Sequence, residues 1–483
     1  MEAPDVYHRG LDTLRVSRKK LHSKTRGKLV DGMQKKVPAA EQGVAIFKGG
    51  AASNHYDTDN EPVFRQESYF HYLFGVTEPN WYGAIDIKTG KSVLFMPRLP
   101  PSYAVWMGAL KTTDDCKSIY AVDEVRYTDE IEAVLKSMNP ACLHLMSGTN
   151  SDSGNACLPA EFDGIKNFKK ETEHLYPVLR ECRVFKTPEE IEILQYSSKI
   201  ASESHCKMIQ SCKPGMMEYQ LESNFLHHCY FAGGSRKAAY TPISASGPNP
   251  AVLHYGHEGA PNDRQILDGD LVLCDMGCKY YGYDSDITTT FPASGKFTPN
   301  QKMVYEAVLN AHQSVIKEMK PGVNMLDMHK LAERCILQGL IDGGVLRGDV
   351  NDMLSKFLGG VFMPHGLGHM LGLDTHDVGG YPEDGPPRST DPGRKNLRTA
   401  RTLQENMVLT VEPGCYFIPT LLDEATQEAS TKDFFVSEKL KEFEGFGGVR
   451  LEDNVVITPN GCMSMTRVPR TVTEIENTMA SVT

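Results

Sequence analysis

The sequence has no CxxC cysteine pair and no apolar segment long enough to cross a membrane. Its twelve cysteines are scattered, and some lie within apolar runs, as Cys274 and Cys415 do. This usage is typical of reduced, buried thiols in a cytoplasmic protein rather than of a disulfide framework. The lack of a long apolar run and of an apolar signal core argues against membrane spanning and secretion.

The sequence also lacks an excess of positive charge. It contains 62 acidic and 51 basic residues, and its formal net charge is -11. A nucleic-acid partner would attract clustered Lys and Arg, so this balance argues against one. The basic N-terminal stretch RVSRKKLHSKTRGK is short, and we expect it to form a solvated surface.

Three common enzyme motifs are missing as well. There is no GxGxxG loop and no Walker lysine motif, so nothing supports a phosphate cradle. There is no GxSxG sequence either, which argues against the nucleophile elbow of a serine hydrolase.

Two segments with the same helix signals indicate an internal repeat. Residues 187–190 read Thr-Pro-Glu-Glu and residues 298–301 read Thr-Pro-Asn-Gln, and both fit a capping box that starts a helix. A Lys-Pro-Gly triplet follows each helix, at residues 213–215 and 320–322, and predicts its end. We interpret this as a degenerate repeat of helix, turn, helix and strands; the alternative is chance recurrence of common helix signals.

The repeat divides the chain into two predicted domains. Residues 185–483 would form one α+β domain from the two repeated halves. Residues 1–184 differ in pattern, because they mix β-rich segments such as WYGAIDI and SVLFMP with helical ones.

The segment GDLVLCDMGCKYYGYDSDITTTFP, residues 269–292, predicts a β-hairpin that carries two acidic residues. If its loop is Lys279–Gly282, Asp275 lies directly opposite Asp286, with Cβ atoms about 4.5–5.5 Å apart. Two like charges in a partly buried pair repel each other and lose hydration, so a positive group must compensate them. A one-residue bulge would break this register, and a surface hairpin with solvated aspartates is the alternative.

Further chemistry-bearing residues follow downstream. The segment MPHGLGHMLGLDTHDVGG contains His365, His369 and His376. A strand in MVLTVEPGCYF ends at Glu412, and Glu452 lies within the apolar strand of GGVRLEDNVVIT. An acidic residue in such a strand is unusual and indicates a compensated charge.

Two Asp, one His and two Glu form a plausible ligand set for two divalent ions, since two dications would balance four carboxylates. Oxygen-rich ligands with one imidazole favour Mn²⁺ or another hard ion over a Cys-type structural zinc site. Two ions about 3.5–4 Å apart can share and deprotonate a water. The spacing predicts hydrolysis but does not choose between carbonyl and phosphoryl substrates.

The order of Asp275, Asp286, HGLGH, TVEPG and RLED resembles the metallopeptidase branch of the pita-bread fold. The chain is most similar to the prolidase (Xaa-Pro dipeptidase) group of that branch, and the resemblance covers nearly the whole chain. It extends to FRQESYFHYLFGVTEP, FMPRLPPSYAVWMG and HYGHEGAPNDR. It implies an N-terminal creatinase-like α/β domain over 1–184, for dimerisation and covering of the site. It also implies a pita-bread catalytic domain over 185–483, with an internal pseudo-twofold repeat.

The resemblance implies a role for each matching residue. The ligands of two Mn²⁺ ions per subunit would be Asp275, Asp286, His369, Glu412 and Glu452. Asp286 and Glu452 would bridge the ions, and Glu412 would handle the proton of the attacking water. His254 and His376 would hydrogen-bond the substrate and the oxyanion. Arg450 would position the acidic cluster from behind.

The resemblance also implies Xaa-Pro dipeptides as substrates. Arg398 would bind the proline carboxylate, with Arg401 as the competing candidate, and Tyr240 would line the pocket. His365 resembles a residue behind the ligands, and a structural histidine is an equal alternative. In the homodimer that the family forms, Trp106 would reach the partner's site; a simple core Trp is the alternative.

Two other functions remain open at this stage. One is an Xaa-Pro aminopeptidase of the same fold, which would need room for longer peptides and no carboxylate clamp. The other is a non-catalytic pita-bread interaction module, which would lose metal ligands, whereas all five are present. We therefore expect a cytoplasmic, homodimeric dipeptidase with neither nucleic-acid nor membrane partners.

Overall fold

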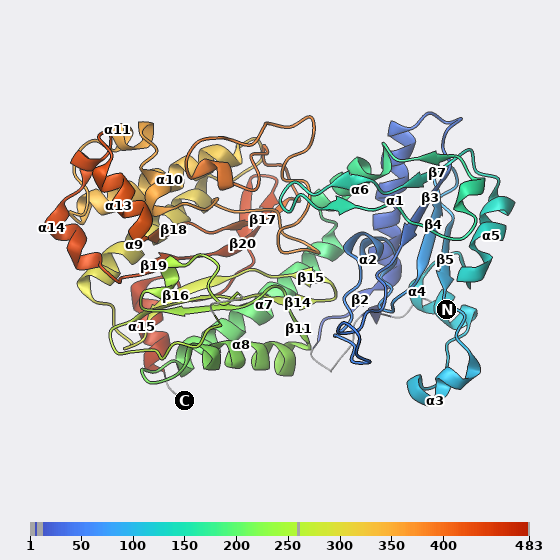
Figure 1. Ribbon diagram of the computed structural model, residues 1–483, viewed down its shortest axis with the longest axis horizontal. Coiled ribbons are helices and arrows are strands. Elements are labelled where there is room, and N and C mark those ends of the chain that lie inside the picture. Colours follow the sequence, from blue (N-terminus) through green and yellow to red (C-terminus); the bar gives the residue numbers. More distant parts are fainter. Residues whose placement is uncertain (1–4, 7–12, 258–260, 482–483) are drawn as a thin grey trace. The chain divides into compact units, whose positions relative to one another are not determined.

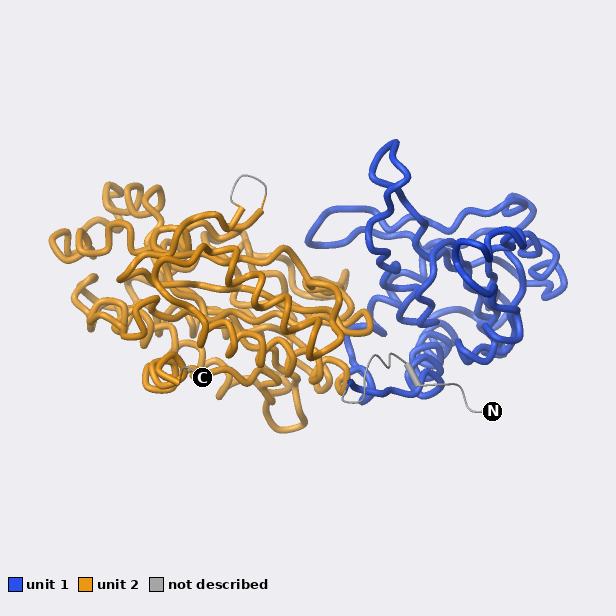
Figure 2. The backbone as a smooth tube through the Cα atoms, turned by 90° about the horizontal axis from the view of Figure 1, so that it is seen from below, with its two compact units in different colours: residues 1–190 blue, residues 191–483 orange. Residues whose placement is uncertain are grey.

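The computed structural model describes residues 5–6, 13–257 and 261–481. Its chain divides into two compact units, residues 1–190 and 191–483 (Figure 2). The division falls near the start of α7 (Pro188–Ser211), whereas the sequence analysis placed the boundary between residues 184 and 185, ahead of that helix.

The first unit is built around a six-stranded mixed sheet of order β10-β7-β3-β4-β5-β6 (Figure 1). Its central strands are rich in β-branched and aromatic residues, which pack well on a pleated surface. Val44, Ile46, Val93 and Phe95 belong to the core on this sheet. The strands are β1 (Asp5–Val6), β2 (Val16–Ser17), β3 (Val44–Lys48), β4 (Tyr82–Asp86), β5 (Ser92–Met96), β6 (Glu124–Tyr127), β7 (Leu143–Leu145), β8 (Gly148–Thr149), β9 (Ala156–Cys157) and β10 (Lys170–Glu171).

Helices accompany this sheet, and the first corrects a sequence expectation. Helix α1 contains most of the basic N-terminal stretch, but it buries Arg26 instead of exposing it. Arg26 donates to the carbonyls of Leu73 (2.9 Å) and Ala121 (2.7 Å), so its charge is solvated by backbone rather than by water. The helices are α1 (Arg18–Lys36), α2 (Ser68–Phe74), α3 (Ala104–Met107), α4 (Thr113–Tyr120), α5 (Ile131–Met138), α6 (Leu175–Val184), and the 3₁₀ turns η1 (Pro101–Tyr103), η2 (Thr128–Glu130) and η3 (Ile165–Asn167).

The second unit has the predicted order of helix, turn, helix and strands twice. Thr187 and Glu190 form the reciprocal bonds of a capping box at the start of α7, and Thr298 and Gln301 do the same for α9. The helices are α7, α8 (Glu218–Gly233), α9 (Pro299–Glu318), α10 (Met325–Asp342), α11 (Val350–Ser355), α12 (Gly359–Phe362), α13 (Pro419–Gln427), α14 (Ser437–Leu440), α15 (Val472–Ala480), and the turns η4 (Asn249–Ala251), η5 (Arg394–Asn396), η6 (Lys432–Phe434) and η7 (Lys441–Phe443).

The strands of the second unit form small antiparallel sheets of order β12-β13-β16, β11-β14-β15, β17-β20-β21 and β18-β19. A bridge between Thr288 and Glu452 joins the strands of the first half to those of the second. The strands are β11 (Lys237–Ala238), β12 (Ile243–Ser246), β13 (Leu271–Asp275), β14 (Cys278–Tyr280), β15 (Tyr283–Asp284), β16 (Thr288–Pro292), β17 (Val408–Val411), β18 (Gly414–Tyr416), β19 (Gly448–Arg450), β20 (Asp453–Thr458) and β21 (Gly461–Ser464).

The hairpin of residues 269–292 exists, but the predicted register was wrong by two residues. Asp275 pairs with Thr288 and not with Asp286. The turn is Tyr281–Gly282, where both residues have positive φ (44° and 83°), and such two-residue turns match the twist of the flanking strands. A shift of two residues preserves the side-chain face, so Asp275 and Asp286 remain diagonal neighbours.

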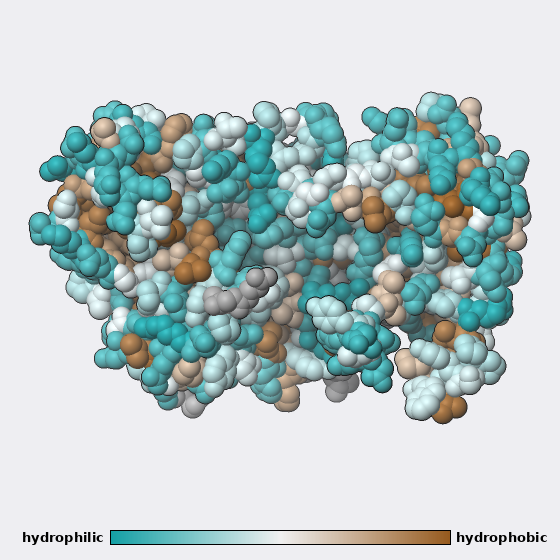
Figure 3. Space-filling model, viewed as in Figure 1, coloured by the Kyte–Doolittle hydropathy of each residue, from teal (hydrophilic) through white to brown (hydrophobic). Residues whose placement is uncertain are grey.

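The surface shown in Figure 3 is largely hydrophilic, with apolar groups scattered in small patches. Among the helices that the structure describes, none is both long and apolar enough to cross a membrane.

Candidate metal centre

Four carboxylates and one imidazole meet where the two halves of the second unit join. Asp275 ends β13, Asp286 lies between β15 and β16, and Glu412 follows β17. Glu452 precedes β20 and donates its backbone N–H to the Thr288 carbonyl (3.1 Å). Ligand atoms of Asp286, His369 and Glu452 all lie within 4.8 Å of one another.

The Tyr240 hydroxyl lies between the two aspartates. It is 2.5 Å from Asp275 Oδ1 and is also within hydrogen-bonding distance of Asp286 Oδ1. A phenol carries one proton, so it donates to one of these oxygens at a time. The other contact requires a proton or a cation between the oxygens.

His369 is held with one ring nitrogen toward the carboxylates. Its Nδ1 lies 3.0 Å from the Met370 carbonyl, which fixes a proton on that atom. Its Nε2 lies 3.3 Å from Asp286 Oδ2 and 3.5 Å from Glu412 Oε1. This is the orientation that a metal-ligating histidine needs, because a carbonyl behind the ring sets the tautomer.

The carboxylates are too crowded to be fully ionised without a cation. Burial, then the charges of Asp286 and Glu412, raise the pKa of Glu452 well above its ordinary value. Burial is also the main cause that raises the pKa of Asp275 to about 6 and that of Glu412 to about 7. For Asp286, burial is the largest single influence and would raise the pKa, but His369, Tyr240 and His376 together outweigh it, so the pKa is lowered.

Arg450 compensates part of this charge. Its guanidinium donates to Asp275 Oδ2 (2.7 Å), to Thr288 Oγ1 (3.2 Å) and to the Tyr416 hydroxyl (2.6 Å). Thr288 Oγ1 in turn donates to Glu452 Oε2 (2.7 Å). One guanidinium and one imidazole still leave a negative excess against four carboxylates, so the donor set fits divalent cations.

Comparisons with known proteins agree with this geometry. Residues 192–459 match the family described as "Metallopeptidase family M24", and residues 22–144 match "Aminopeptidase P, N-terminal domain". The chain belongs to metallopeptidase family M24. The resemblance inferred from the sequence motifs is thereby confirmed, and so is the expectation of an enzyme.

Individual relatives of this M24 chain cover almost its whole length. It is 53% identical to human Xaa-Pro dipeptidase over 98% of this chain and 95% of that protein. It is 35% identical to a probable Xaa-Pro aminopeptidase of Verticillium alfalfae over 94% of this chain and 96% of that protein.

Solved structures give the same picture of the fold. A histidine-to-alanine variant of Escherichia coli aminopeptidase P superimposes with a TM-score of 0.79 at 31% identity, covering 97% of this chain and 99% of that one. The same enzyme with the inhibitor Pro-Leu gives a TM-score of 0.77 at 30% identity, with the same coverage. The predicted fold, an α+β chain with a creatinase-like N-terminal domain and a pita-bread C-terminal domain, is confirmed.

Two of the predicted substrate residues, His376 and Arg398, lie near the carboxylate cluster or near one another. The His376 ring meets the His369 ring edge-on, with centroids 4.5 Å apart. The pKa of His254 is lowered, chiefly by partial burial of the His254 ring and then by the positive charges of His257 and Arg398. Arg398 therefore lies within electrostatic reach of His254, and it acts on His376 in the same way.

The sequence left the roles of Arg401, His365 and Trp106 undecided, and the structure shows the environment of each. Arg401 is buried and donates to the Gly379 carbonyl (2.9 Å), so part of its guanidinium fixes a loop. His365 Nε2 lies 3.0 Å from the Tyr416 hydroxyl, and its Nδ1 lies 3.9 Å from Glu412. Trp106, in the first unit, is 83% exposed, so the alternative of a simple core tryptophan is wrong.

Three residues of the site were not predicted. Thr288 connects Arg450 to Glu452, and the Tyr416 hydroxyl lies between Arg450 and His365. Thr410 Oγ1 lies 3.2 Å from Glu412 Oε1 and accepts the backbone N–H of His369 (3.0 Å). The period of two along a strand was an available signal, since it places Thr288 on the face of Asp286 and Thr410 on that of Glu412. Tyr416 carried no such signal.

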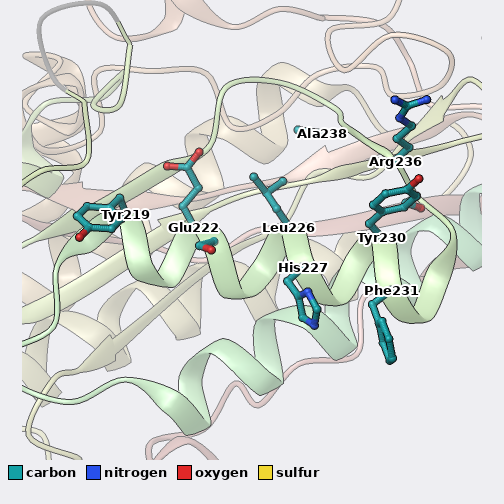
Figure 4. A pocket seen from close by; sticks show the side chains of 10 residues that line it. Tyr219, Glu222, Leu226, His227, Tyr230, Phe231, Arg236 and Ala238 are labelled. Carbon is teal, nitrogen blue, oxygen red and sulfur yellow. The ribbon is translucent and has the colours of Figure 1, made fainter. Parts of the chain in front are cut away.

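A surface pocket of about 850 Å³ lies on α8, away from these residues (Figure 4). Tyr219, Glu222, Leu226 and Tyr230 line it at the spacing of one helix face, and Arg236 follows the helix. Neither the carboxylates nor the predicted substrate residues line this pocket, so it is not the candidate catalytic site.

Proposed function

We propose that the chain hydrolyses Xaa-Pro dipeptides at a centre that holds two divalent ions, with Mn²⁺ as the preferred metal. The observation that carries the proposal is the cluster of Asp275, Asp286, His369, Glu412 and Glu452. Its four carboxylates match the charge of two dications, and oxygen-rich donors suit Mn²⁺. The identity of 53% to human Xaa-Pro dipeptidase supports the substrate class.

When bound, two such ions supply Lewis acidity and a water whose pKa is lowered. The chain's own residues then handle protons and position. Glu412 accepts the proton of the attacking water, and its position beside His369 places it within the proposed centre. Arg450 keeps Asp275 in place through its 2.7 Å bond.

His254 and His376 donate hydrogen bonds to the substrate and to the oxyanion that forms at the scissile carbonyl. The edge-on contact of His376 with His369 supports this role, because it places one histidine beside a proposed ligand. Donors that are already aimed at the developing charge stabilise it without having to reorganise. Tyr240 orders the two aspartates and lines the same pocket.

Arg398 binds the carboxylate of the substrate proline. Its influence on both His254 and His376 supports this choice over Arg401. A tripeptide offers an amide at that position, so this clamp separates the dipeptidase from an aminopeptidase of the same fold. The Xaa-Pro bond lacks an N–H, which explains why a specialised site is needed.

The proposed assembly is a homodimer in which Trp106 covers the site of the other copy. The 83% exposure of Trp106, beside the exposed Val105 and Met107, supports a protein contact at this segment. The twelve free cysteines support a reducing compartment, and we propose the cytoplasm.

Metal content and hydrolysis of Gly-Pro, measured on the same sample, test the proposal. We expect about two ions per chain and loss of activity after chelation. Arg398→Ala should retain the metal and lose about 10- to 100-fold activity on Gly-Pro, the value of a charge-assisted pair. Arg401→Ala, at the competing candidate, should retain activity on Gly-Pro. Equal hydrolysis of Gly-Pro and of Xaa-Pro tripeptides would favour the aminopeptidase instead.

A further inference from the structure

The segment Leu371–His376 follows the proposed ligand His369 and carries His376 at its end. It contacts strand β17 on one side and the β14–β15 hairpin on the other. On one side it is tied to β17: the Leu371 N–H donates to the Val408 carbonyl (3.0 Å), and Met370 forms a bridge with Leu409. The Asp377 N–H donates back to the Met370 carbonyl (2.8 Å) and closes the loop at its base.

On the other side the segment is tied to the β14–β15 hairpin. The Asp284 N–H donates to the Gly372 carbonyl (2.8 Å), and Lys279 Nζ donates to the Leu373 carbonyl (2.6 Å). Thr375 Oγ1 donates to Asp284 Oδ2 (3.0 Å). Three successive parts of the loop are therefore fastened to one hairpin.

The hairpin side of this contact is a nearly buried ion pair. Lys279 Nζ lies 3.0 Å from Asp284 Oδ1, and the two side chains are 14% and 2% exposed. Lys279 also donates to the Gly282 carbonyl (2.9 Å) in the positive-φ turn. A buried pair contributes little net stability, because desolvation offsets the attraction, but it specifies one arrangement of the groups it joins.

The residue that needs such an arrangement is His376. It is exposed, so packing around its ring restrains it less than the backbone that carries it does. Thr375, its immediate neighbour, is a loop residue whose side chain reaches the hairpin. Rigid support of this kind is what a precisely placed hydrogen-bond donor requires.

We propose that Lys279, Asp284 and Thr375 are positioning residues that hold His376 in place for the substrate. The inference rests on the proposed function, in which His376 hydrogen-bonds the substrate. It adds that the β14–β15 hairpin determines where this donor lies.

A double-mutant cycle of Thr375→Val and His376→Ala tests the proposal. Thr375→Val keeps the side-chain shape and removes the hydroxyl, so kcat on Gly-Pro should fall about fivefold to tenfold, the value of one hydrogen bond. KM and metal content should change little. In the His376→Ala background, Thr375→Val should have no further effect, because the two residues act as one unit.

Three controls separate positioning from general stability. Thr375→Ser retains the hydroxyl and should restore kcat. Thr426→Val removes a comparable hydroxyl, which donates to the Leu422 carbonyl on α13, and should leave kcat unchanged. Lys279→Met should reproduce the loss of kcat, whereas Lys302→Met, from an exposed lysine–carboxylate pair on α9, should not.

Amide hydrogen exchange of residues 371–377 gives a readout that does not depend on turnover. Exchange in this segment should be faster in Thr375→Val than in the wild type and in Thr426→Val. Unchanged exchange overturns the proposal, and so does a kcat loss that adds in full to that of His376→Ala. If His376→Ala is impaired but Thr375→Val is not, the positioning role fails while the proposed function stands. If the wild type does not cleave Gly-Pro, the proposed function fails, and the exchange measurement still decides the loop contact.

Discussion

Two adjacent buried carboxylates, Glu452 and Asp453, have opposite environments. Glu452 is 1% exposed and faces the other carboxylates of the cluster, which together with burial raises its pKa. Asp453 is 6% exposed but is paired: Arg470 Nε donates to it at 3.1 Å and Ser464 Oγ at 2.7 Å. For Asp453 these partners, with His312, outweigh burial, and its pKa is lowered.

The difference assigns the two acids different roles: Asp453 stabilises the fold, and Glu452 belongs to the proposed metal centre. Successive side chains of a strand point to opposite faces, so Glu452 and Asp453 serve different neighbours. Asp453 and Arg470 neutralise each other and fasten the C-terminal segment, since Arg470 also donates to the Thr288 carbonyl (2.7 Å). The Glu452 side is left with excess negative charge, and a charge that the protein does not neutralise is available to a ligand.

The largest expected effect is on the Glu452 side. Glu452→Gln should abolish measurable Gly-Pro hydrolysis, because it removes a proposed bridging ligand. Metal-free Glu452→Gln should melt no lower than the metal-free wild type, since it removes a carboxyl group whose ionisation burial and its neighbours oppose. Activity assays and calorimetry check this. Retained turnover with two ions bound would contradict the bridging role.

On the other side, Asp453→Asn should destabilise the fold instead. Breaking one partner of a buried pair leaves Arg470 uncompensated, and the free energy of unfolding should fall by about 3–5 kcal/mol. Urea unfolding measures it. Asp129→Asn, from the exposed Arg98–Asp129 pair, should lower the free energy of unfolding far less, because solvent screens that pair. A similar decrease in the free energy of unfolding for both variants would show that the buried Asp453–Arg470 pair stabilises the fold no more than an exposed pair does.

Added metal should stabilise the fold through the Glu452 cluster and not through the Asp453–Arg470 pair. Mn²⁺ at 100 times its dissociation constant should stabilise the fold by about 2.7 kcal/mol per independent site. This gain should persist in Asp129→Asn and shrink in Glu452→Gln. Calorimetric titration checks it, and an unchanged melting temperature in the wild type would argue against a preformed centre.

The smallest effect concerns pH. The folded-state pKa values of Asp275 and Glu412 are raised to about 6 and about 7, so their contribution to metal-free stability is present at low pH and is lost as pH rises through these values. The lowered pKa of Asp453 has the opposite sign, and its contribution is lost as pH falls below its ordinary range. The free energy of unfolding with saturating Mn²⁺ minus that without metal should therefore increase from pH 4 to pH 8, because groups outside the cluster contribute equally to both measurements. A difference that does not change with pH would contradict the crowding of the carboxylates.

Local signals made part of this structure predictable. The capping boxes at Thr187 and Thr298 predicted two helix starts, because a side chain and a backbone N–H three residues apart satisfy each other without tertiary help. The alternation of strand residues predicted that Asp275 and Asp286 share a face. The register was missed because it depends on which two residues adopt positive φ, and Tyr281 gave no sign of doing so.

The order of elements, the repeat and the set of acidic residues available for a metal centre depend on neighbours along the chain, so they could be predicted before the fold was known. Which carboxylates stay unpaired depends on contacts that form in three dimensions. In LED, residues 451–453, the two acids are chemically alike. Their roles diverge because Arg470 arrives on one face of the strand and three other carboxylates arrive on the other, and electrostatic energies depend on distances that folding alone creates.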